Sequence, residues 1–484
     1  MVLLKGRFRF TKEKLTNIFV FLGLLFATVR MIRGIDNLYV LALLSFCGIF
    51  FLNYKKLYEP DFKKLLMWFL PFGIWASLSA IWSLEPLISF SRGLFYIFIS
   101  STAVLIGFIY KNKTRVLFKQ FLIINGLIVV ISFLSLISGI PSDAWTANHG
   151  LGFTSIFIHQ NTLAAVLMFT LIGPVYFLIN CLPASLLGRV IPDSNTESKK
   201  GSLSHSSFEM TKKIGVISNP FRVRNLILKW ESIFSLLLIL SNLYFIYLSY
   251  SRAVMLALFI GGLTFIYLLG TVKFNLIFTL FLIISGASVF YFFGNNINTY
   301  LKKGGSDYFA RRNILWEPSY KAALNGGIIG LGYGVTDPTI ESNYKKENRF
   351  GELKREKGNS ILALVEETGI IGLVLFLLPV VKVTLSFINN FKQSGIRNQI
   401  TVKSNSSLIT HHGAQVLHQT PITKNSSLIT LYSSLVFAFL LSFIIHSQFE
   451  GWFVGISSFY LIVFVTMLSS LIARSYVSSV LSNQ

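Results

Sequence analysis

The chain has 484 residues, of which 53% are hydrophobic and 13% are charged, and its mean hydropathy is +0.63. This composition excludes an ordinary soluble protein, in which about 25% of the residues are charged. The formal net charge of +23 is typical of basic connections on the cytoplasmic side of a membrane protein. Because no nucleic-acid-binding motif accompanies this charge, we expect no nucleic-acid partner.

Long apolar runs follow one another along the chain. Runs of roughly 17–25 residues predict membrane-spanning α-helices, and we count about twelve of them. The sequence therefore predicts an all-α polytopic membrane protein. In chain order the predicted spans are residues 15–32, 37–54, 65–83, 89–110, 116–139, 156–182, 231–250, 253–270, 273–293, 359–389, 431–447 and 451–473.

The Lys and Arg residues predict which side of the membrane each connection faces. If the N-terminus is cytoplasmic, the long basic connections are cytoplasmic too, and the short connections on the other side carry only Arg33, Arg92 and Arg252 as cations. This asymmetry follows the positive-inside rule. It places both termini in the cytoplasm and a large polar connection, residues 294–358, on the opposite, outer side between the ninth and tenth spans.

Two basic connections are predicted to be disordered insertions. Residues 183–230 are rich in Ser and Lys and are interrupted by prolines, a composition that does not support a packed core. Residues 390–430 contain a short duplication and three histidines, but no Cys or carboxylate accompanies them, so we expect no metal site. The resulting regions are 1–182, 183–230, 231–293, 294–358, 359–389, 390–430 and 431–484.

Polar residues gather at or near the predicted outer ends of the spans. An arginine there works against the positive-inside bias and is costly unless it serves a partner. Arginine is also suited to planar, bidentate recognition of phosphate oxygens. Together these residues predict that two or three arginines converge on an anionic ligand from the outer leaflet. The clusters are Ser91-Arg92-Gly93, His159-Gln160-Asn161, Ser249-Tyr250-Ser251-Arg252 and, in the large connection, Arg311-Arg312 with Trp316.

Each of these residues also has a structural interpretation. Arg252 is suited to capping helix ends or to reaching lipid headgroups, lipid phosphates would satisfy Arg92, and Asn161 is suited to capping its helix. One of Arg311 and Arg312 is equally explained as a solvated loop charge.

Two absences narrow the chemistry. The sequence has no Gly-rich nucleotide loop followed by Lys-Ser/Thr, which argues against an ATP-driven pump, and no Asp-rich stretch that predicts a divalent metal. A transferase that uses a lipid-linked diphosphate donor is consistent with both absences, and such an enzyme needs no cofactor. The arginines would stabilise charge on the diphosphate leaving group, and a base would deprotonate the acceptor hydroxyl.

Several motifs occur in a defined order between about residues 150 and 380. They are Gly152-Phe153 through His159-Gln160-Asn161-Thr162-Leu163-Ala164, Ser251-Arg252-Ala253, Arg312-x-x-x-Trp316, Gly330-Leu331-Gly332-Tyr333-Gly334, Asn359-Ser360-Ile361-Leu362 and Glu366-Glu367-Thr368-Gly369-Ile370-Ile371-Gly372. This order resembles the O-antigen ligase and O-antigen polymerase superfamily of bacterial envelope glycosyltransferases. The resemblance implies glycan transfer from an undecaprenyl diphosphate carrier at the periplasmic face of the inner membrane, with Arg252 and Arg312 handling the diphosphate.

One position departs from the family pattern. Ligases usually carry a His directly before the Asn that opens the tenth span, and here Gly358 precedes Asn359. The departure removes the expected acceptor-activating base and favours a polysaccharide polymerase that uses another group. Glu366 and Glu367, about two turns into that span, are candidate substitutes, and His159 is either a further candidate base or an interfacial histidine.

The sequence thus predicts a metal-independent polymerase of lipid-linked repeat units. The alternatives are a ligase that joins a glycan to a lipid or protein acceptor, a transporter of lipid-linked sugar, which would have inverted repeats, and an inactive member of the family. The expected partners are the lipid-linked oligosaccharide and membrane lipids, with a chain-length regulator as a further candidate. Substrate binding is assigned to Arg92, Asn161, Arg252, Arg311, Arg312, Trp316 and Asn359.

Overall fold

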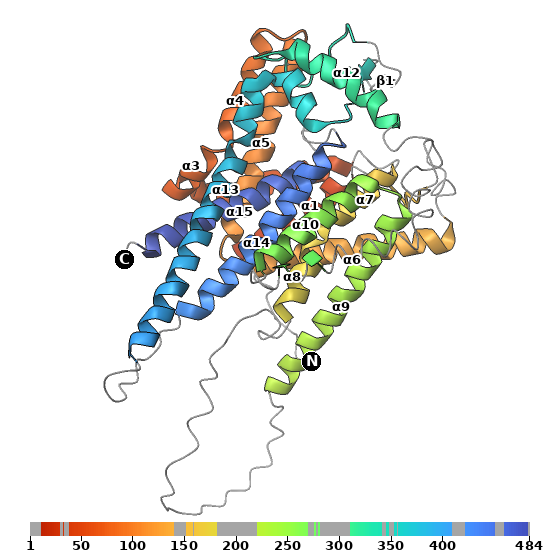
Figure 1. Ribbon diagram of the computed structural model, residues 1–484. Helices are drawn as coiled ribbons and strands as arrows, with labels where there is room; N and C mark the ends of the chain where they lie inside the picture. The colour runs from red at the N-terminus through yellow and green to blue at the C-terminus, as the bar shows by residue number, and fades with distance from the viewer. Residues whose placement is uncertain are drawn as a thin grey trace, which may run out of the picture.

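The computed structural model describes residues 11–29, 32, 38–139, 152–157, 159–181, 220–269, 275–276, 279–280, 310–340, 345–347, 353–355, 357–408, 422–450 and 459–482. In these ranges the chain forms a bundle of α-helices with one short two-stranded antiparallel ribbon (Figure 1). The elements are α1 (Lys12–Val29), α2 (Tyr39–Asn53), η2 (Tyr54–Tyr58), α3 (Pro60–Leu66), α4 (Leu70–Leu78), η3 (Ser79–Ile81), α5 (Pro86–Tyr110), α6 (Thr114–Ser138), α7 (Gln160–Thr170), α8 (Ile172–Cys181), α9 (Pro220–Leu248), α10 (Arg252–Leu269), α12 (Ala310–Gly326), β1 (Lys345–Glu347), β2 (Leu353–Arg355), α13 (Ser360–Leu408), α14 (Ile422–Ser447) and α15 (Phe459–Ser482).

The apolar runs form helices because a helix satisfies its own backbone hydrogen bonds where lipid offers no partner. By length and composition, six helices of the described residues can cross a membrane, and the bent pair α3–α4 is a seventh candidate with a 50° bend. Three shorter apolar helices lie at Arg252–Leu268, Leu431–Ser447 and Phe459–Ser475. The protein is therefore a multi-pass membrane protein. The count of twelve spans is not confirmed, and most of the ninth, residues 273–293, lies outside the described residues.

The helices extend further than the sequence predicted. Residues 220–230, 390–408 and 422–430 are helical, so the prediction of disorder in the two basic connections is wrong at these positions. Each added residue of a formed helix gains a backbone hydrogen bond, and the ladder continues past the apolar stretch. Helix α13 also continues through Pro379, although proline cannot donate a backbone hydrogen bond.

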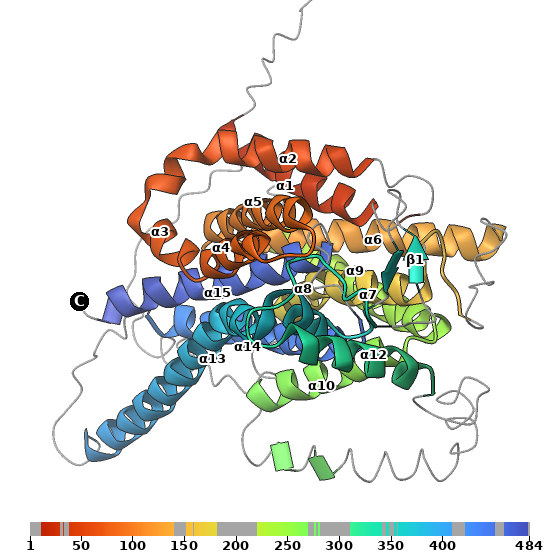
Figure 2. The same ribbon diagram turned by 90° about the horizontal axis from the view of Figure 1, so that it is seen from above.

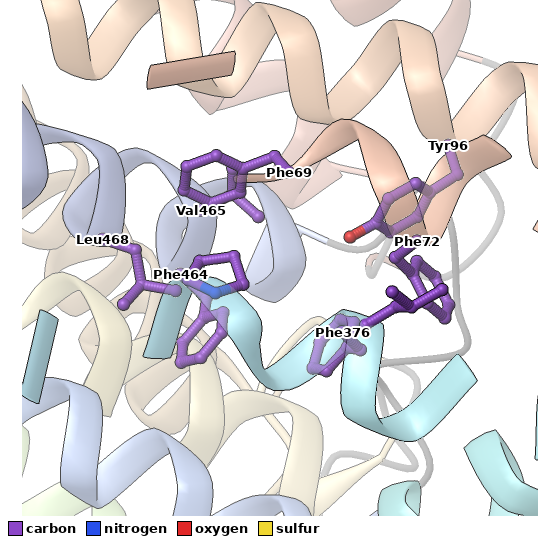
Figure 3. Close-up of a pocket in the computed structure, with 9 residues that line it drawn as sticks. Phe69, Phe72, Tyr96, Phe376, Phe464, Val465 and Leu468 are labelled. Atoms are coloured by element: carbon purple, nitrogen blue, oxygen red, sulfur yellow. The ribbon is translucent and has the colours of Figure 1, made fainter. Parts of the chain in front are cut away.

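Viewed from above, α1 and α2 lie side by side along one edge of the bundle and α10 lies at the opposite edge (Figure 2). A small apolar crevice lies between α4, α5, α13 and α15. Aromatic rings such as Phe72, Phe376 and Phe464 line it together with Pro379 (Figure 3). No charged side chain lines this crevice, so it gives no sign of a polar site.

Small residues allow pairs of helices to pack closely. A Cβ at Gly107 of α5 would overlap the Oγ of Ser469 and lie 2.6 Å from the carbonyl oxygen of Thr466 on α15. A Cβ at Gly261 of α10 would likewise overlap the Oγ of Ser442 on α14. Close approach through small residues is a common way to join helices in lipid, where burial of apolar surface contributes little to helix association.

The long helix α13 is broken at Gly369, where φ is 70° and ψ is −177°. Glycine adopts this conformation readily, and a Cβ here would overlap the carbonyl group of Ile328. Because the helix is interrupted, the carbonyl groups of Glu366 and Glu367 lose their intrahelical partners. Broken helices at membrane depth are tolerated where other protein groups supply the missing hydrogen bonds.

The glycine loop, residues 326–334, supplies those hydrogen bonds. They run from Leu331 N to Glu366 O (2.9 Å), from Gly332 N to Glu367 O (2.9 Å), from Ile370 N to Gly327 O (3.1 Å) and from Ile371 N to Ile328 O (3.2 Å). Two indole groups add to them: Trp75 Nε1 donates to Thr368 O (2.8 Å), and Trp82 Nε1 donates to Gly330 O (3.2 Å). The broken helix and the glycine loop therefore form one hydrogen-bonded unit.

We predict that Gly107→Val destabilises the protein by about 1–3 kcal/mol, because the new side chain forces α5 away from α15. The matched control is Gly262→Ala, since a Cβ at Gly262 meets nothing within 4 Å. Thermal unfolding in detergent, followed by fluorescence, measures both. Equal melting temperatures for the two variants would contradict the close approach of these helices.

Candidate active site

The start of α13 is fixed by Asn359. Its Oδ1 accepts hydrogen bonds from the backbone N–H groups of Ile361 (2.8 Å) and Leu362 (3.1 Å), which makes it the N-cap of the helix. Its Nδ2 donates to the carbonyl oxygen of Gln448, just beyond the end of α14, at 3.0 Å. One side chain thus caps α13 and joins it to α14.

Helix α12 contacts the chain directly before α13. Trp316 Nε1 donates to the carbonyl oxygen of Gly358 (3.3 Å), and the indole ring lies 5.8 Å from the ring of Phe449, centroid to centroid. Arg311 and Arg312 belong to the first turn of α12, but their side chains lie outside the described part of the structure. Their predicted role in substrate binding stays a prediction.

The start of α7 lies at the same end of the bundle. His159 is its N-cap, and its Nδ1 accepts a hydrogen bond from the backbone N–H of Asn161 at 3.1 Å. An accepting Nδ1 is unprotonated, so the neutral ring carries its proton on Nε2. The cap that we considered for Asn161 is therefore made by His159, which leaves the Asn161 side chain for another contact.

That contact is with Glu450, in the connection after α14. Asn161 Nδ2 donates to Glu450 Oε1 at 2.8 Å, and the Oγ of Ser360 donates to the backbone carbonyl of Glu450 at 2.5 Å. Glu450 is thus joined to the starts of both α7 and α13, and it is half-buried. Sequence reasoning missed Glu450, because an acidic residue in a short connection between two spans belongs to no motif.

We call the meeting point of Asn161, Trp316, Asn359 and Glu450 the junction. It brings together α7, α12, α13 and the end of α14.

Arg252 begins α10 after a tight turn in which Tyr250 has a positive φ of 52°. The turn packs on the segment before α7: Phe153 N donates to Leu248 O at 2.9 Å. A Cβ at the neighbouring Gly152 would overlap the Gln160 side chain and lie 2.7 Å from the carbonyl oxygen of Ser249. Because Gln160 is followed directly by Asn161, the start of α10 lies at the junction end of the bundle.

The junction therefore has an electrostatic character of its own. The N-termini of α7, α10 and α13 lie at this end, and helix N-termini carry a partial positive charge that favours anions. Arg252 is half-buried at the first position of α10 and adds a full positive charge. Glu450 adds a carboxylate. Such a combination is suited to binding an anion and to moving a proton.

Glu366 and Glu367 occupy a different place, which we call the clamp. They are 0% and 2% exposed. Lys357 Nζ lies 2.5 Å from Glu367 Oε1 and 3.4 Å from Glu366 Oε2. The other oxygens accept backbone N–H bonds, Glu367 Oε2 from Gly334 (2.7 Å) and Glu366 Oε1 from Asp337 (3.0 Å). Both carboxylates thus hold the glycine loop and its continuation in place.

Arg92 also belongs to the clamp. Its guanidinium donates to the carbonyl oxygen of Gly334 at 3.0 Å, and it is half-buried. The adjacent Tyr333 is fully buried, and burial, with Glu367 nearby, raises the pKa of its phenol well above the usual value. The structure therefore places Arg92 at the glycine loop, and its predicted substrate-binding role stays a prediction.

The predicted site residues fall into two groups. Asn161, Trp316 and Asn359 meet at the junction, with His159 as a cap beside them and Arg252 at the same end of the bundle. Arg92, Glu366 and Glu367 form the clamp, about two turns further along α13. Within the described ranges, no group of three or more His, Cys, Asp or Glu residues is placed to hold a metal ion.

We predict that Lys357→Met destabilises the protein by about 3–5 kcal/mol, because it leaves two buried carboxylates without their cation. The matched control is Lys321→Met. Lys321 pairs with Glu317 at 2.8 Å on the surface of α12, where both side chains are more than half exposed, so its loss should leave the melting temperature nearly unchanged. Thermal unfolding in detergent measures both, and equal shifts would contradict the structural role of the clamp.

Comparison with known proteins agrees with the resemblance seen in the motifs. A family model described as O-Antigen ligase matches residues 234–377. The matched segment includes Arg252, α12, the glycine loop and the clamp glutamates, whereas Asn161 and Glu450 lie outside it. No curated protein and no solved structure matches the chain. Residues 234–377 are thus similar to the O-antigen ligase family, and they belong to a multi-pass membrane protein.

Proposed function

We propose that the protein polymerises lipid-linked oligosaccharide repeat units, carried on undecaprenyl diphosphate, at the periplasmic face of the bacterial inner membrane. The observation that carries this proposal is the position of Arg252 at the N-terminus of α10, inside the segment that matches the O-antigen ligase family. The starts of α7 and α13 lie at the same end of the bundle. In this proposal both termini are cytoplasmic, and residues 294–358 are periplasmic.

Arg252 would bind the diphosphate of the donor. A guanidinium holds phosphate oxygens with two parallel hydrogen bonds and cannot lose its charge near neutral pH. As the bond between sugar and phosphate breaks, negative charge grows on the leaving diphosphate, and a fixed cation stabilises that charge without a metal ion. Arg312, one turn before Trp316 in α12, is proposed to assist from the connection above.

The packing at Gly358 supports a polymerase over a ligase. A Cβ at this position would lie 2.9 Å from the Cβ of Leu315, which is tighter than nearly all real contacts of this kind. The carbonyl oxygen of Gly358 also accepts the hydrogen bond from Trp316. Leu315 and Trp316 of α12 thus fill the place where a ligase would present its histidine. A ligase-type base at this position would require α12 to move away.

We predict that Arg252→Ala lowers polymerisation by at least about a hundredfold, the usual loss when one charge-stabilising donor is removed. Arg252→Lys should retain part of the activity, since it keeps the charge but not the bidentate geometry. The control is Arg115→Ala, because Arg115 makes an exposed ion pair with Glu231 on another face. Gel analysis of polysaccharide chain length in the source strain, at equal protein abundance, is the measurement.

Long polysaccharide of normal length in the Arg252→Ala strain would overturn this assignment. Arg312→Ala should have the same effect as Arg252→Ala, again at unchanged protein abundance.

A deletion strain separates the alternatives. Loss of a polymerase leaves single repeat units on the carrier, whereas loss of a ligase leaves long polymer on the carrier. Purified protein that lengthens lipid-linked oligosaccharide in vitro excludes a transporter. A chain-length regulator would be detected as a protein that co-purifies and narrows the product lengths.

A further inference from the structure

We propose that the carboxylate of Glu450 is the general base that accepts the proton of the attacking sugar hydroxyl. This inference rests on the glycosyl transfer proposed above and names the group that Gly358 leaves missing. Position, orientation and the state of the competing bases support it.

Glu450 is held from two sides. Asn161 Nδ2 donates to its Oε1 at 2.8 Å, and Ser360 Oγ donates to its backbone carbonyl at 2.5 Å. The first contact fixes the carboxylate against the start of α7, and the second fixes the backbone against the start of α13. A carboxylate has about four acceptor positions, so a hydrogen bond from an amide orients it and still allows it to accept a proton.

Glu450 also lies next to the position where a ligase presents its histidine. The residues that follow Gly358 contact the segment that carries Glu450: Asn359 Nδ2 donates to Gln448 O, and Ser360 Oγ donates to Glu450 O. A base on the connection after α14 therefore reaches the same region from the opposite side. Leu315 of α12 packs at Gly358, and Glu450 approaches the same helix start from the end of α14.

The other candidate bases make structural contacts. Glu366 and Glu367 are 0% and 2% exposed, and their oxygens contact Lys357 and backbone N–H groups, so a sugar hydroxyl would have to displace the glycine loop to reach them. The Nδ1 of His159 accepts the capping hydrogen bond of α7. Glu450, in contrast, is half-buried and lies at the end of the bundle where Arg252 begins α10.

The proposed step balances as follows. The hydroxyl oxygen of the acceptor sugar forms a bond with the anomeric carbon of the donor, and the bond between that carbon and the diphosphate oxygen breaks. The electron pair of the broken bond stays on the diphosphate, next to Arg252. The hydroxyl proton moves to Glu450, which later releases it to water. The products are the lengthened glycan and undecaprenyl diphosphate.

Asn161 is a positioning residue in this scheme, because it acts through Glu450. Its replacement should lower the turnover number more than it changes the Michaelis constant for the donor. Asn161→Asp would place a second negative charge beside the carboxylate and should be more harmful than Asn161→Ala.

The test uses full-length protein in lipid nanodiscs, with the lipid-linked material that accumulates in a deletion strain as substrate. Glu450→Gln keeps the shape and the acceptor for Asn161 but cannot take the proton. We expect its transfer rate to fall about 100- to 10,000-fold, while binding of undecaprenyl diphosphate changes less than about threefold. Sodium formate, a small carboxylate, should restore part of the rate in Glu450→Ala. Glu231→Gln is the matched control, because Glu231 is a half-buried carboxylate that pairs with Arg115 and belongs to neither the junction nor the clamp.

Each outcome decides the proposal. Normal transfer by Glu450→Gln with loss of transfer by Arg252→Ala overturns the role of Glu450 and leaves the proposed function standing. Normal transfer by both variants overturns the proposed function as well. If Glu450→Gln loses undecaprenyl diphosphate binding together with transfer, the residue serves binding or structure and is not the base. Melting temperatures of all variants show whether a lost rate reflects a lost fold.

Discussion

The backbone hydrogen bonds at the break in α13 are the constraint on which the site depends. At Gly369 the hydrogen-bond pattern of the helix is interrupted. Inside a membrane protein, the backbone N–H and C=O groups left unpaired there need other partners. The glycine loop supplies them in both directions, so the loop cannot move without exposing unpaired backbone groups. An unmade buried hydrogen bond costs about 1–3 kcal/mol. The clamp of Lys357 with its two glutamates then fixes the same loop through side chains, and α12, which ends at the loop, is held over the junction.

At the junction, helix caps lie directly beside the residues of the proposed chemistry. A helix start needs an acceptor for its free N–H groups, and Asn359 and His159 provide one each, for α13 and α7. Their capping roles fix the helix ends to within the length of a hydrogen bond. As a result, the neighbouring Asn161 and Ser360 can reach across to Glu450. Residues that the sequence suggests as substrate contacts thus also set the geometry in which another residue acts.

How much of the fold and of the candidate site could be predicted from the sequence depends on how far apart in the chain the interacting residues lie. Helices follow from local apolar composition, and the arginine motifs indicated the family, so both were accessible. Glu450 could not be identified from the sequence, because what marks it is a hydrogen bond to Asn161, 289 residues earlier in the chain. The same holds for Arg92, which contacts Gly334 from 242 residues away. Glu366 looked available as a base because no local pattern reveals that Lys357 and backbone N–H groups occupy it.

The break at Gly369 also has a mechanical consequence. Residues 360–368 form a separate half-helix about 13 Å long, and the hydrogen bonds at its lower end make a pivot between the two halves of α13. The apolar half below the pivot can change its tilt when the bilayer becomes thicker or thinner, which is how spanning helices accommodate hydrophobic mismatch. The upper half keeps its alignment with the glycine loop. Changes in lipid chain length or temperature would then alter the tilt of the lower half of α13 and leave the junction in place.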